Sequence, residues 1–169
     1  DPEWNFLGAS TDGVSSMLDN IEIKTISSRK LKARIKQEYY HQMQHQMECL
    51  GLTKSDFLEV KYGYLDNQID FNKLDHQLER GSIIELYNLE EKRYVYEYSP
   101  IVNDDNGSKI INDWIKNRMN IIKEYDDRIF TRYIFWYLIE YSHRIVRKDS
   151  NWIKTVGPKL REFWDEVIE

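Results

Sequence analysis

The chain has few of the residues that cross-link or interrupt a fold. Among its 169 residues it has one cysteine, Cys49, three prolines and seven glycines. A single cysteine excludes an internal disulfide framework and is compatible with a reducing compartment. Nothing close to Cys49 in the sequence would activate its thiol. We therefore expect a buried helical residue rather than a nucleophile.

Long apolar runs are missing as well. No stretch is long enough to cross a bilayer and no signal peptide is evident, so we expect no membrane contact. Aromatic residues reach 14% and hydrophobic residues 41%, which indicates a packed fold rather than disorder. Because there is no internal repeat, linker or low-complexity tract, the sequence predicts one domain over residues 1–169.

Positive charge is scarce overall but is locally clustered. The formal net charge is −5, which does not by itself indicate a nucleic-acid-binding protein. A local patch matters more than the total charge, however. The chain has one such patch, which consists of Arg29, Lys30, Lys32, Arg34 and Lys36. It either follows the phosphates of DNA beside an active site or forms a solvated loop and helix start, and its position favours the contact with DNA.

The stretch with the most candidate catalytic residues is residues 6–25, FLGASTDGVSSMLDNIEIKT. It predicts a strand, a tight turn and a second strand, with Asp12 in the turn signal Thr-Asp-Gly. Apolar and charged residues then alternate from Ile21 to Lys24. The strand period of two places Glu22 and Lys24 on one face. Two acids and a lysine would therefore meet at the edge of one small sheet.

This trio suits the hydrolysis of a phosphodiester. The carboxylates of Asp12 and Glu22, with the carbonyl of Ile23 between them, can hold magnesium or manganese. Such a metal lowers the pKa of a bound water and neutralises charge on a phosphate, while Lys24 can position the attacking water. The alternative is a hairpin with a charged, solvated outer face, because short motifs of this kind often match by accident.

The pattern Asp12 followed by Glu22-x-Lys24 resembles the core of the PD-(D/E)XK nuclease superfamily. The segments GAS-x-DG, IEIKT and YYHQMQ are similar to those of the phage lambda-type alkaline exonucleases and their relatives in large DNA viruses. The resemblance covers about residues 4–62 of the chain. It implies an α/β fold with a restriction-endonuclease-like core, in which helices flank a mixed central β-sheet.

The resemblance also implies roles for further residues. A glutamine on the helix after the lysine strand completes the active site in this family, and it maps to Gln42, which would orient Lys24 or the attacking water. Ser10, two residues before the motif aspartate, would contact a DNA phosphate. The chain opens at Asp1 without methionine, and we expect it to lack an upstream helix of the fold.

The function implied by the resemblance is a metal-dependent exonuclease that degrades duplex DNA from 5′ to 3′. It would act in recombination or repair, possess a ring-like homo-oligomeric form, and come from a virus that replicates in the host cytoplasm. Two alternatives stay open: an inactive nuclease-derived module that binds DNA or a protein partner, and an endonuclease of the same superfamily. The retained quartet of Asp12, Glu22, Lys24 and Gln42 favours the enzyme.

The remaining pattern predicts helices over residues 35–50, 108–124 and 151–169, and strands over residues 57–64, 83–87, 93–98 and 133–146. In the first helix Tyr39, Met43, Met47 and Leu50 follow the helical repeat and should face the core. His41 and His45 have a spacing that can bind zinc. No third ligand is evident, so we interpret both as polar helix residues.

Overall fold

A computed structural model describes residues 2–31 and 34–168. By their contacts they form two compact units: unit 1 is Asp1–Val60 with Tyr141–Glu169, and unit 2 is Lys61–Glu140. Hydrogen bonds link six strands in the order β1-β2-β3-β6-β4-β5. No helix in the described part of the chain is both long and apolar enough to cross a membrane.

The predicted mixed α/β architecture is confirmed at this level, because the sheet contains both parallel and antiparallel pairs. The finer prediction of a restriction-endonuclease-like core stays a prediction. The same holds for the assignment of residues 1–169 to one nuclease domain.

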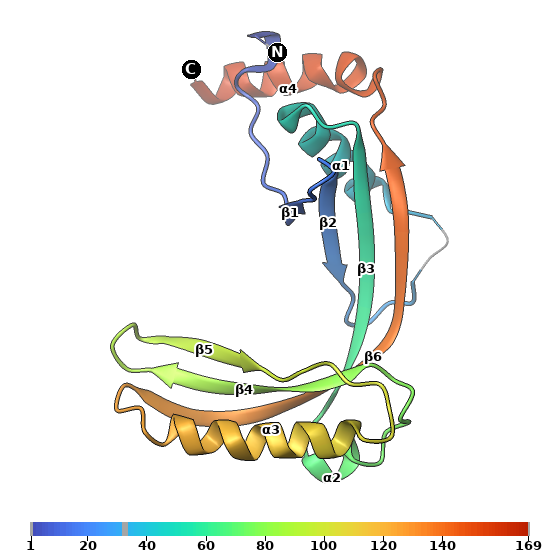
Figure 1. Cartoon of the computed structure of the whole chain (residues 1–169). Coiled ribbons are helices and arrows are strands. Elements are labelled where there is room, and N and C mark those ends of the chain that lie inside the picture. The colour runs from blue at the N-terminus through green and yellow to red at the C-terminus, as the bar shows by residue number, and fades with distance from the viewer. Residues whose placement is uncertain (1, 32–33, 169) are drawn as a thin grey trace. The chain divides into compact units, whose positions relative to one another are not determined.

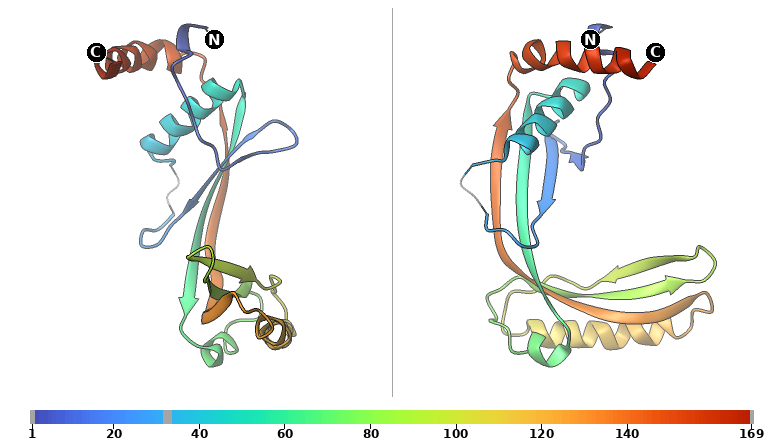
Figure 2. Two further views of the ribbon diagram at one scale, coloured as in Figure 1. Left: turned by 90° about the vertical axis from the view of Figure 1, so that its left-hand side faces the viewer. Right: turned by 180° about the vertical axis from the view of Figure 1, so that it is seen from behind.

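Unit 1 contains a parallel strand pair joined by a helix (Figure 1). Its elements are η1 (Pro2–Trp4), β1 (Gly13–Val14), β2 (Asn20–Thr25), α1 (Gln37–Leu50), the first part of β3 (Lys54–Leu65), the last part of β6 (Arg128–Arg147) and α4 (Trp152–Ile168). Parallel neighbours need a crossover, and α1 supplies it. The left view of Figure 2 shows α1 on one side of β2 and β3.

Helix α1 forms where the sequence predicts it and packs with the predicted side chains. Met43 and Met47, one turn apart, are fully buried against Phe57 of β3. Gly51 ends the helix with φ +67°, a conformation in which a Cβ would be strained. Leu50 does not face the core as expected, because it is 42% exposed at the last helical position.

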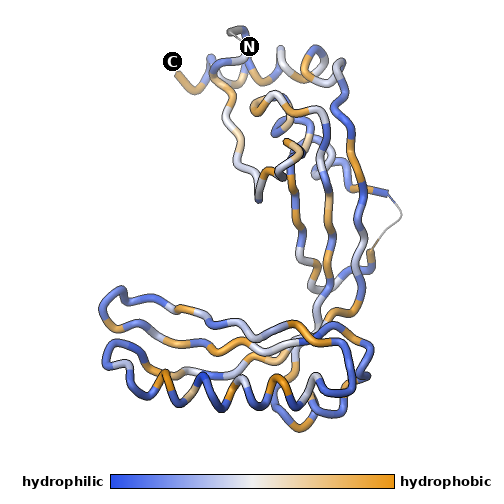
Figure 3. The backbone as a smooth tube through the Cα atoms, viewed as in Figure 1, coloured by the Kyte–Doolittle hydropathy of each residue, from blue (hydrophilic) through white to orange (hydrophobic). Residues whose placement is uncertain are grey.

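Unit 2 packs one helix against an antiparallel sheet. It holds α2 (Gln68–Phe71), β4 (Arg80–Asn88), β5 (Arg93–Tyr98), α3 (Gly107–Ile122) and the rest of β3 and β6. Hydrophilic and hydrophobic segments alternate along α3 in Figure 3, as the helical period requires. Its buried side includes Ile111, Ile115 and Ile122, which pack in cores with residues of α2, β4 and β6.

The N-terminal segment packs against α4 in unit 1. The Phe6 ring stacks on Trp164 with centroids 5.8 Å apart. A Cβ built at Gly157 would lie 2.4 Å from the Trp4 ring, so glycine is needed for this close approach. Pro158 follows inside α4. The helix continues through this proline from Trp152 to Ile168.

Cys49 lies on α1 and is partly buried, as expected. Burial and the neighbouring Glu48 carboxylate raise the pKa of its thiol. Less thiolate is then present at a given pH, and thiolate is the form that reacts. We predict that iodoacetamide alkylates Cys49 several-fold more slowly in the folded chain than in the denatured chain at about pH 8. Mass spectrometry of timed samples measures both rates, and equal rates would contradict this.

Candidate active site

Glu22 of β2 is fully buried, although a charged strand face would be solvated in the simpler interpretation of the sequence. The side that carries Glu22 packs toward α1, whereas Ile23 on the opposite side is 43% exposed. The alternation along β2 is therefore as predicted, and its charged side faces inward. The hairpin with a solvated charged face is thus not the structure that forms.

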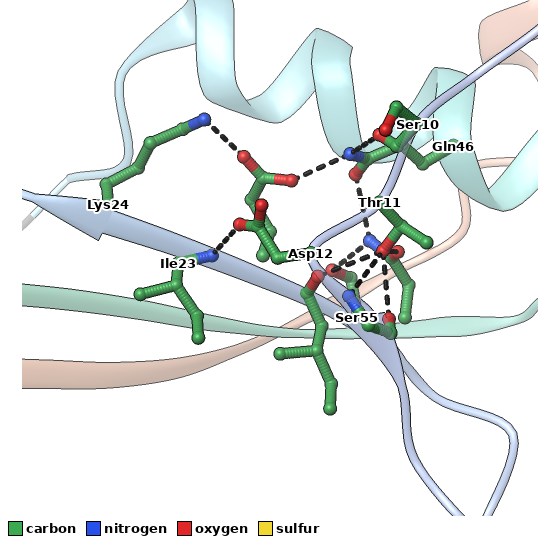
Figure 4. A network of polar contacts seen from close by, with 11 residues as sticks. Ser10, Thr11, Asp12, Ile23, Lys24, Gln46 and Ser55 are labelled. Atoms are coloured by element: carbon green, nitrogen blue, oxygen red, sulfur yellow. Dashed lines mark hydrogen bonds and ion pairs between the residues drawn. The ribbon is translucent and has the colours of Figure 1, made fainter. Parts of the chain in front are cut away.

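Lys24 compensates the buried charge of Glu22. Its ammonium forms an ion pair with Oε1 of Glu22 (Figure 4). The Lys24 side chain is 24% exposed, so one end of this pair reaches solvent. Its Nζ also lies 5.3 Å from the centre of the Tyr39 ring on α1. The sequence prediction that Glu22 and Lys24 lie together is confirmed.

Asp12 reaches the same stretch of β2 from outside the strand. Its Oδ2 accepts a 2.7 Å hydrogen bond from the backbone N–H of Ile23, the residue between Glu22 and Lys24. The predicted turn position of Asp12 is wrong. The turn lies further along, where Leu18 N bonds to the Ser15 carbonyl and Leu18 has φ 60°.

The glutamine that contacts Glu22 is Gln46, one helical turn after the predicted Gln42. Gln46 Nε2 donates to Glu22 Oε2 and to the Ser10 carbonyl, both at 2.7 Å. Gln42 is exposed and makes no hydrogen bond with the described residues. Gln42 thus makes no hydrogen bond with Lys24, and its predicted role in orienting the attacking water stays a prediction.

A buried amide and hydroxyl network holds Gln46 in place. Asn20 Nδ2 donates to Gln46 Oε1 at 2.9 Å and to Ser55 Oγ at 2.8 Å. The Thr11 hydroxyl contacts Asn20 Oδ1 in turn (Figure 4). Because both amide hydrogens and the oxygen of Gln46 are engaged, its orientation is fixed. Asn20 and Thr11 carried no signal in the sequence beyond their position beside the motif.

Oxygen ligands for a hard cation are present in this arrangement. Oε1 of Glu22 is buried and is contacted by the ammonium of Lys24, and Oε2 accepts the hydrogen bond from Gln46. The N–H and C=O of one strand residue point to the same edge, so the Ile23 carbonyl leaves β2 on the side of Asp12. No cluster of three or more His, Cys, Asp or Glu side chains occurs in the described ranges. The predicted ligand set needs only two carboxylates.

One residue of the basic patch is paired with a buried acid, and the predicted DNA contact of the patch stays a prediction. Arg29 forms an ion pair with Glu59, a β3 residue that is 2% exposed, and this hydrogen bond raises the pKa of Arg29. The charge of Arg29 is therefore paired with the buried carboxylate of Glu59. Lys30 and Arg34 are exposed, and Lys32 lies outside the described residues. The predicted DNA contact of Ser10 is untested; its carbonyl binds Gln46.

The ring of Tyr39 lies close to three cationic side chains, a grouping that the sequence does not predict. Nζ of Lys36 lies 5.3 Å from the ring centre and the guanidinium of Arg29 lies 6.0 Å from it, in addition to Lys24. An aromatic face attracts such groups through its quadrupole. Each of these cations is also paired with a carboxylate, Lys24 with Glu22, Arg29 with Glu59 and Lys36 with Glu38, so the cluster around Tyr39 is a set of ion pairs.

His41 and His45 both make polar contacts within unit 1. His41 Nδ1 accepts a 2.7 Å hydrogen bond from the indole N–H of Trp152, and His45 Nε2 lies 3.1 Å from the Gly8 carbonyl oxygen. Indole is only a donor, so Nδ1 of His41 is unprotonated. Both histidines lie on α1 and contact residues outside the helix.

The fold and the site define a mixed α/β protein with a buried carboxylate–lysine pair beside a second carboxylate. No protein-family model matches the chain. The chain is similar to an uncharacterized protein of Acanthamoeba polyphaga mimivirus, with 25% identity over an alignment of 203 residues. The match covers 96% of this chain and 37% of the viral protein, so the chain spans little more than a third of that relative.

Proposed function

We propose that this chain carries the active site of a metal-dependent deoxyribonuclease that hydrolyses duplex DNA from an end. The observation that supports this most is the convergence of Asp12, Glu22 and Lys24 on one short stretch of β2. A fully buried carboxylate is costly to maintain. Its retention beside a lysine and a second carboxylate is understandable where the site binds a cation and acts on a phosphate.

The proposed roles follow from the contacts of each residue. Asp12, Glu22 and the Ile23 carbonyl would hold magnesium or manganese, which when bound activates water and neutralises charge on the phosphate. Lys24, at the solvent-reaching end of the ion pair, would position the attacking water. Gln46 would fix the carboxylate plane of Glu22 by its 2.7 Å hydrogen bond.

The resemblance to lambda-type exonucleases supplies the finer parts of the proposal. These are 5′-to-3′ polarity, action on duplex DNA in recombination or repair, a ring-like homo-oligomer, and a viral source with replication in the host cytoplasm. The similarity to a mimivirus protein is in keeping with a viral source. Strand-specific end labels would report the polarity, and light scattering would report the oligomer.

The proposal predicts that the chain degrades linear duplex DNA in magnesium or manganese and leaves closed circular DNA intact. Removal of the metal with EDTA should stop the reaction, because the carboxylates alone cannot activate water. Gel electrophoresis with end-labelled and circular substrates measures this. Lys116→Ala, which changes an exposed lysine of unit 2, should retain full activity.

Other outcomes of the same experiment select the other functions. Cleavage of closed circles would identify an endonuclease of the same superfamily. DNA that is bound yet uncut with either metal would reject the enzyme and leave a DNA-binding module. Absence of both binding and cleavage would leave a protein partner as the ligand.

A further inference from the structure

A cavity of about 560 Å³ adjoins the proposed active site within unit 1. Three segments line it: the loop at residues 8–10, one side of α1 and the first half of α4. Gln46 belongs to its wall and also binds Glu22, so only one side chain separates the cavity from the buried carboxylate. A volume of this size is typical of small-molecule sites.

The wall formed by α4 is apolar, and its Trp152 ring is held by a hydrogen bond to His41. It presents Trp152, Val156 and Leu160, which follow each other at one-turn spacing along the helix. The indole N–H of Trp152 is already donated to His41, so this ring offers the cavity no free polar group. The α4 wall therefore suits the flat, apolar face of a ligand.

The wall formed by α1 is polar and contains an unused amide. Gln42 lines the cavity, is exposed, and forms no hydrogen bond with the residues that the structure describes. Its carboxamide therefore offers a donor and an acceptor side by side. By contrast, the neighbouring His45 is engaged with the Gly8 carbonyl and Gln46 with Glu22.

The cavity is unsuited to a phosphate. Its one charged lining residue is Glu38, whose carboxylate pairs with Lys36 at 2.9 Å. No arginine or lysine lines it among the described residues, whereas phosphate recognition relies on those side chains. The ligand that fits is uncharged and planar, with donors and acceptors along its edge. Nucleobases have this chemistry, and glutamine pairs with an adenine edge through two hydrogen bonds.

We propose that this cavity binds the base of a nucleotide at the end of the DNA substrate, with Gln42 reading the base edge and the α4 wall covering its face. The inference rests on the proposed nuclease function, because it places the base next to the residue that holds Glu22. It gives Gln42 a role in binding the substrate base rather than in completing the catalytic group.

Binding of a mononucleotide tests the proposal without catalysis. Isothermal titration calorimetry in EDTA compares dAMP with 2-deoxyribose 5-phosphate, which lacks the base. Wild type should bind dAMP and not the sugar phosphate. Gln42→Ala should weaken dAMP binding about tenfold through loss of the paired hydrogen bonds. Gln77→Ala, which removes an exposed glutamine of unit 2, is the matched control and should bind like wild type.

A second variant approaches the cavity from its other wall. Val156→Phe adds volume to the apolar side and should abolish dAMP binding while circular dichroism shows the native helix content. Equal binding of dAMP and sugar phosphate, or no dAMP binding by wild type up to about 10 mM, would overturn the proposal. In DNA degradation, Gln42→Ala should raise KM and leave kcat within about twofold, whereas a catalytic role would lower kcat.

The two proposals fail in distinguishable ways. Binding of dAMP by a chain that cuts no DNA would keep the base cavity and reject the nuclease. DNA degradation without base-dependent dAMP binding would keep the nuclease and reject the cavity.

Discussion

Replacement of Lys24 by methionine is expected to lower the free energy of unfolding by about 3 kcal/mol, because it leaves the buried Glu22 carboxylate without its counter-charge. DNA degradation should fall by about a thousandfold, since the same ammonium is proposed to position the attacking water. Urea unfolding in EDTA measures the stability, and end-labelled DNA measures the rate. A bound magnesium ion should restore part of the lost stability.

A double substitution separates the two effects. Glu22→Gln keeps the shape of the side chain and removes its charge, so Glu22→Gln combined with Lys24→Met should recover most of the stability while activity stays lost. Lys36→Met is the matched control. Lys36 lies at the same distance from Tyr39 as Lys24, but its partner Glu38 is exposed, so the change should cost below about 1 kcal/mol. A Lys24→Met variant as stable as wild type would contradict the proposed compensation.

Replacement of Arg80 by methionine should destabilise unit 2 by about 4 kcal/mol, since it removes the fully buried guanidinium that four partly buried hydrogen bonds to backbone carbonyls depend on. Arg80 is fully buried at the start of β4. Its guanidinium donates to the carbonyls of Asp75 (3.1 Å), His76 (2.9 Å), Leu78 (3.2 Å) and Asp104 (3.1 Å). None of the described acidic side chains pairs with it, so its role is to organise backbone.

Lysine should not rescue this site. Arg80→Lys keeps the charge but loses the planar fork that reaches carbonyls on two segments at once, so a loss of about 2 kcal/mol or more should remain. Urea unfolding followed by tryptophan fluorescence measures both variants. Arg93→Met on β5 is the control, because Arg93 is 69% exposed and pairs with an exposed Glu91. An Arg80→Met variant with wild-type stability would show that water replaces the guanidinium.

Local patterns in the sequence predict much of the fold. Helix α1 is expected over residues 35–50 and spans Gln37–Leu50, and the expected strand over residues 93–98 matches β5. The expected strand over residues 133–146 is β6, which extends from Arg128 to Arg147. Alternation and helical repeats depend on neighbours in the chain, so these elements can be recognised without tertiary information.

The candidate site is predicted less completely, because it depends on which surfaces become buried. Alternation shows that Glu22 and Lys24 share a face, but not that this face lies under α1. Gln42 and Gln46 lie one turn apart on the same side of α1, so the choice between them depends on where α1 is placed along its axis against β2. The ion pair between Arg29 and Glu59 likewise cannot be predicted before the pairing of β2 with β3 is known.

The contacts of the site differ in how much chain they enclose. The bonds from Asp12 to Ile23, from Gln46 to Glu22 and from Asn20 to Ser55 close loops of 11, 24 and 35 residues. The contact between His41 and Trp152, by contrast, spans 111 residues. Short loops cost less entropy to close, so they are favoured early in folding.

This difference implies an order of assembly. The carboxylates, the lysine and their supporting amides can come together while the chain is still being synthesised, once residues up to β3 have emerged. The apolar wall that α4 adds to the cavity needs residues up to Leu160, which emerge later than β3. A nascent chain would thus possess its charged centre before it possesses the surface that we propose selects a base.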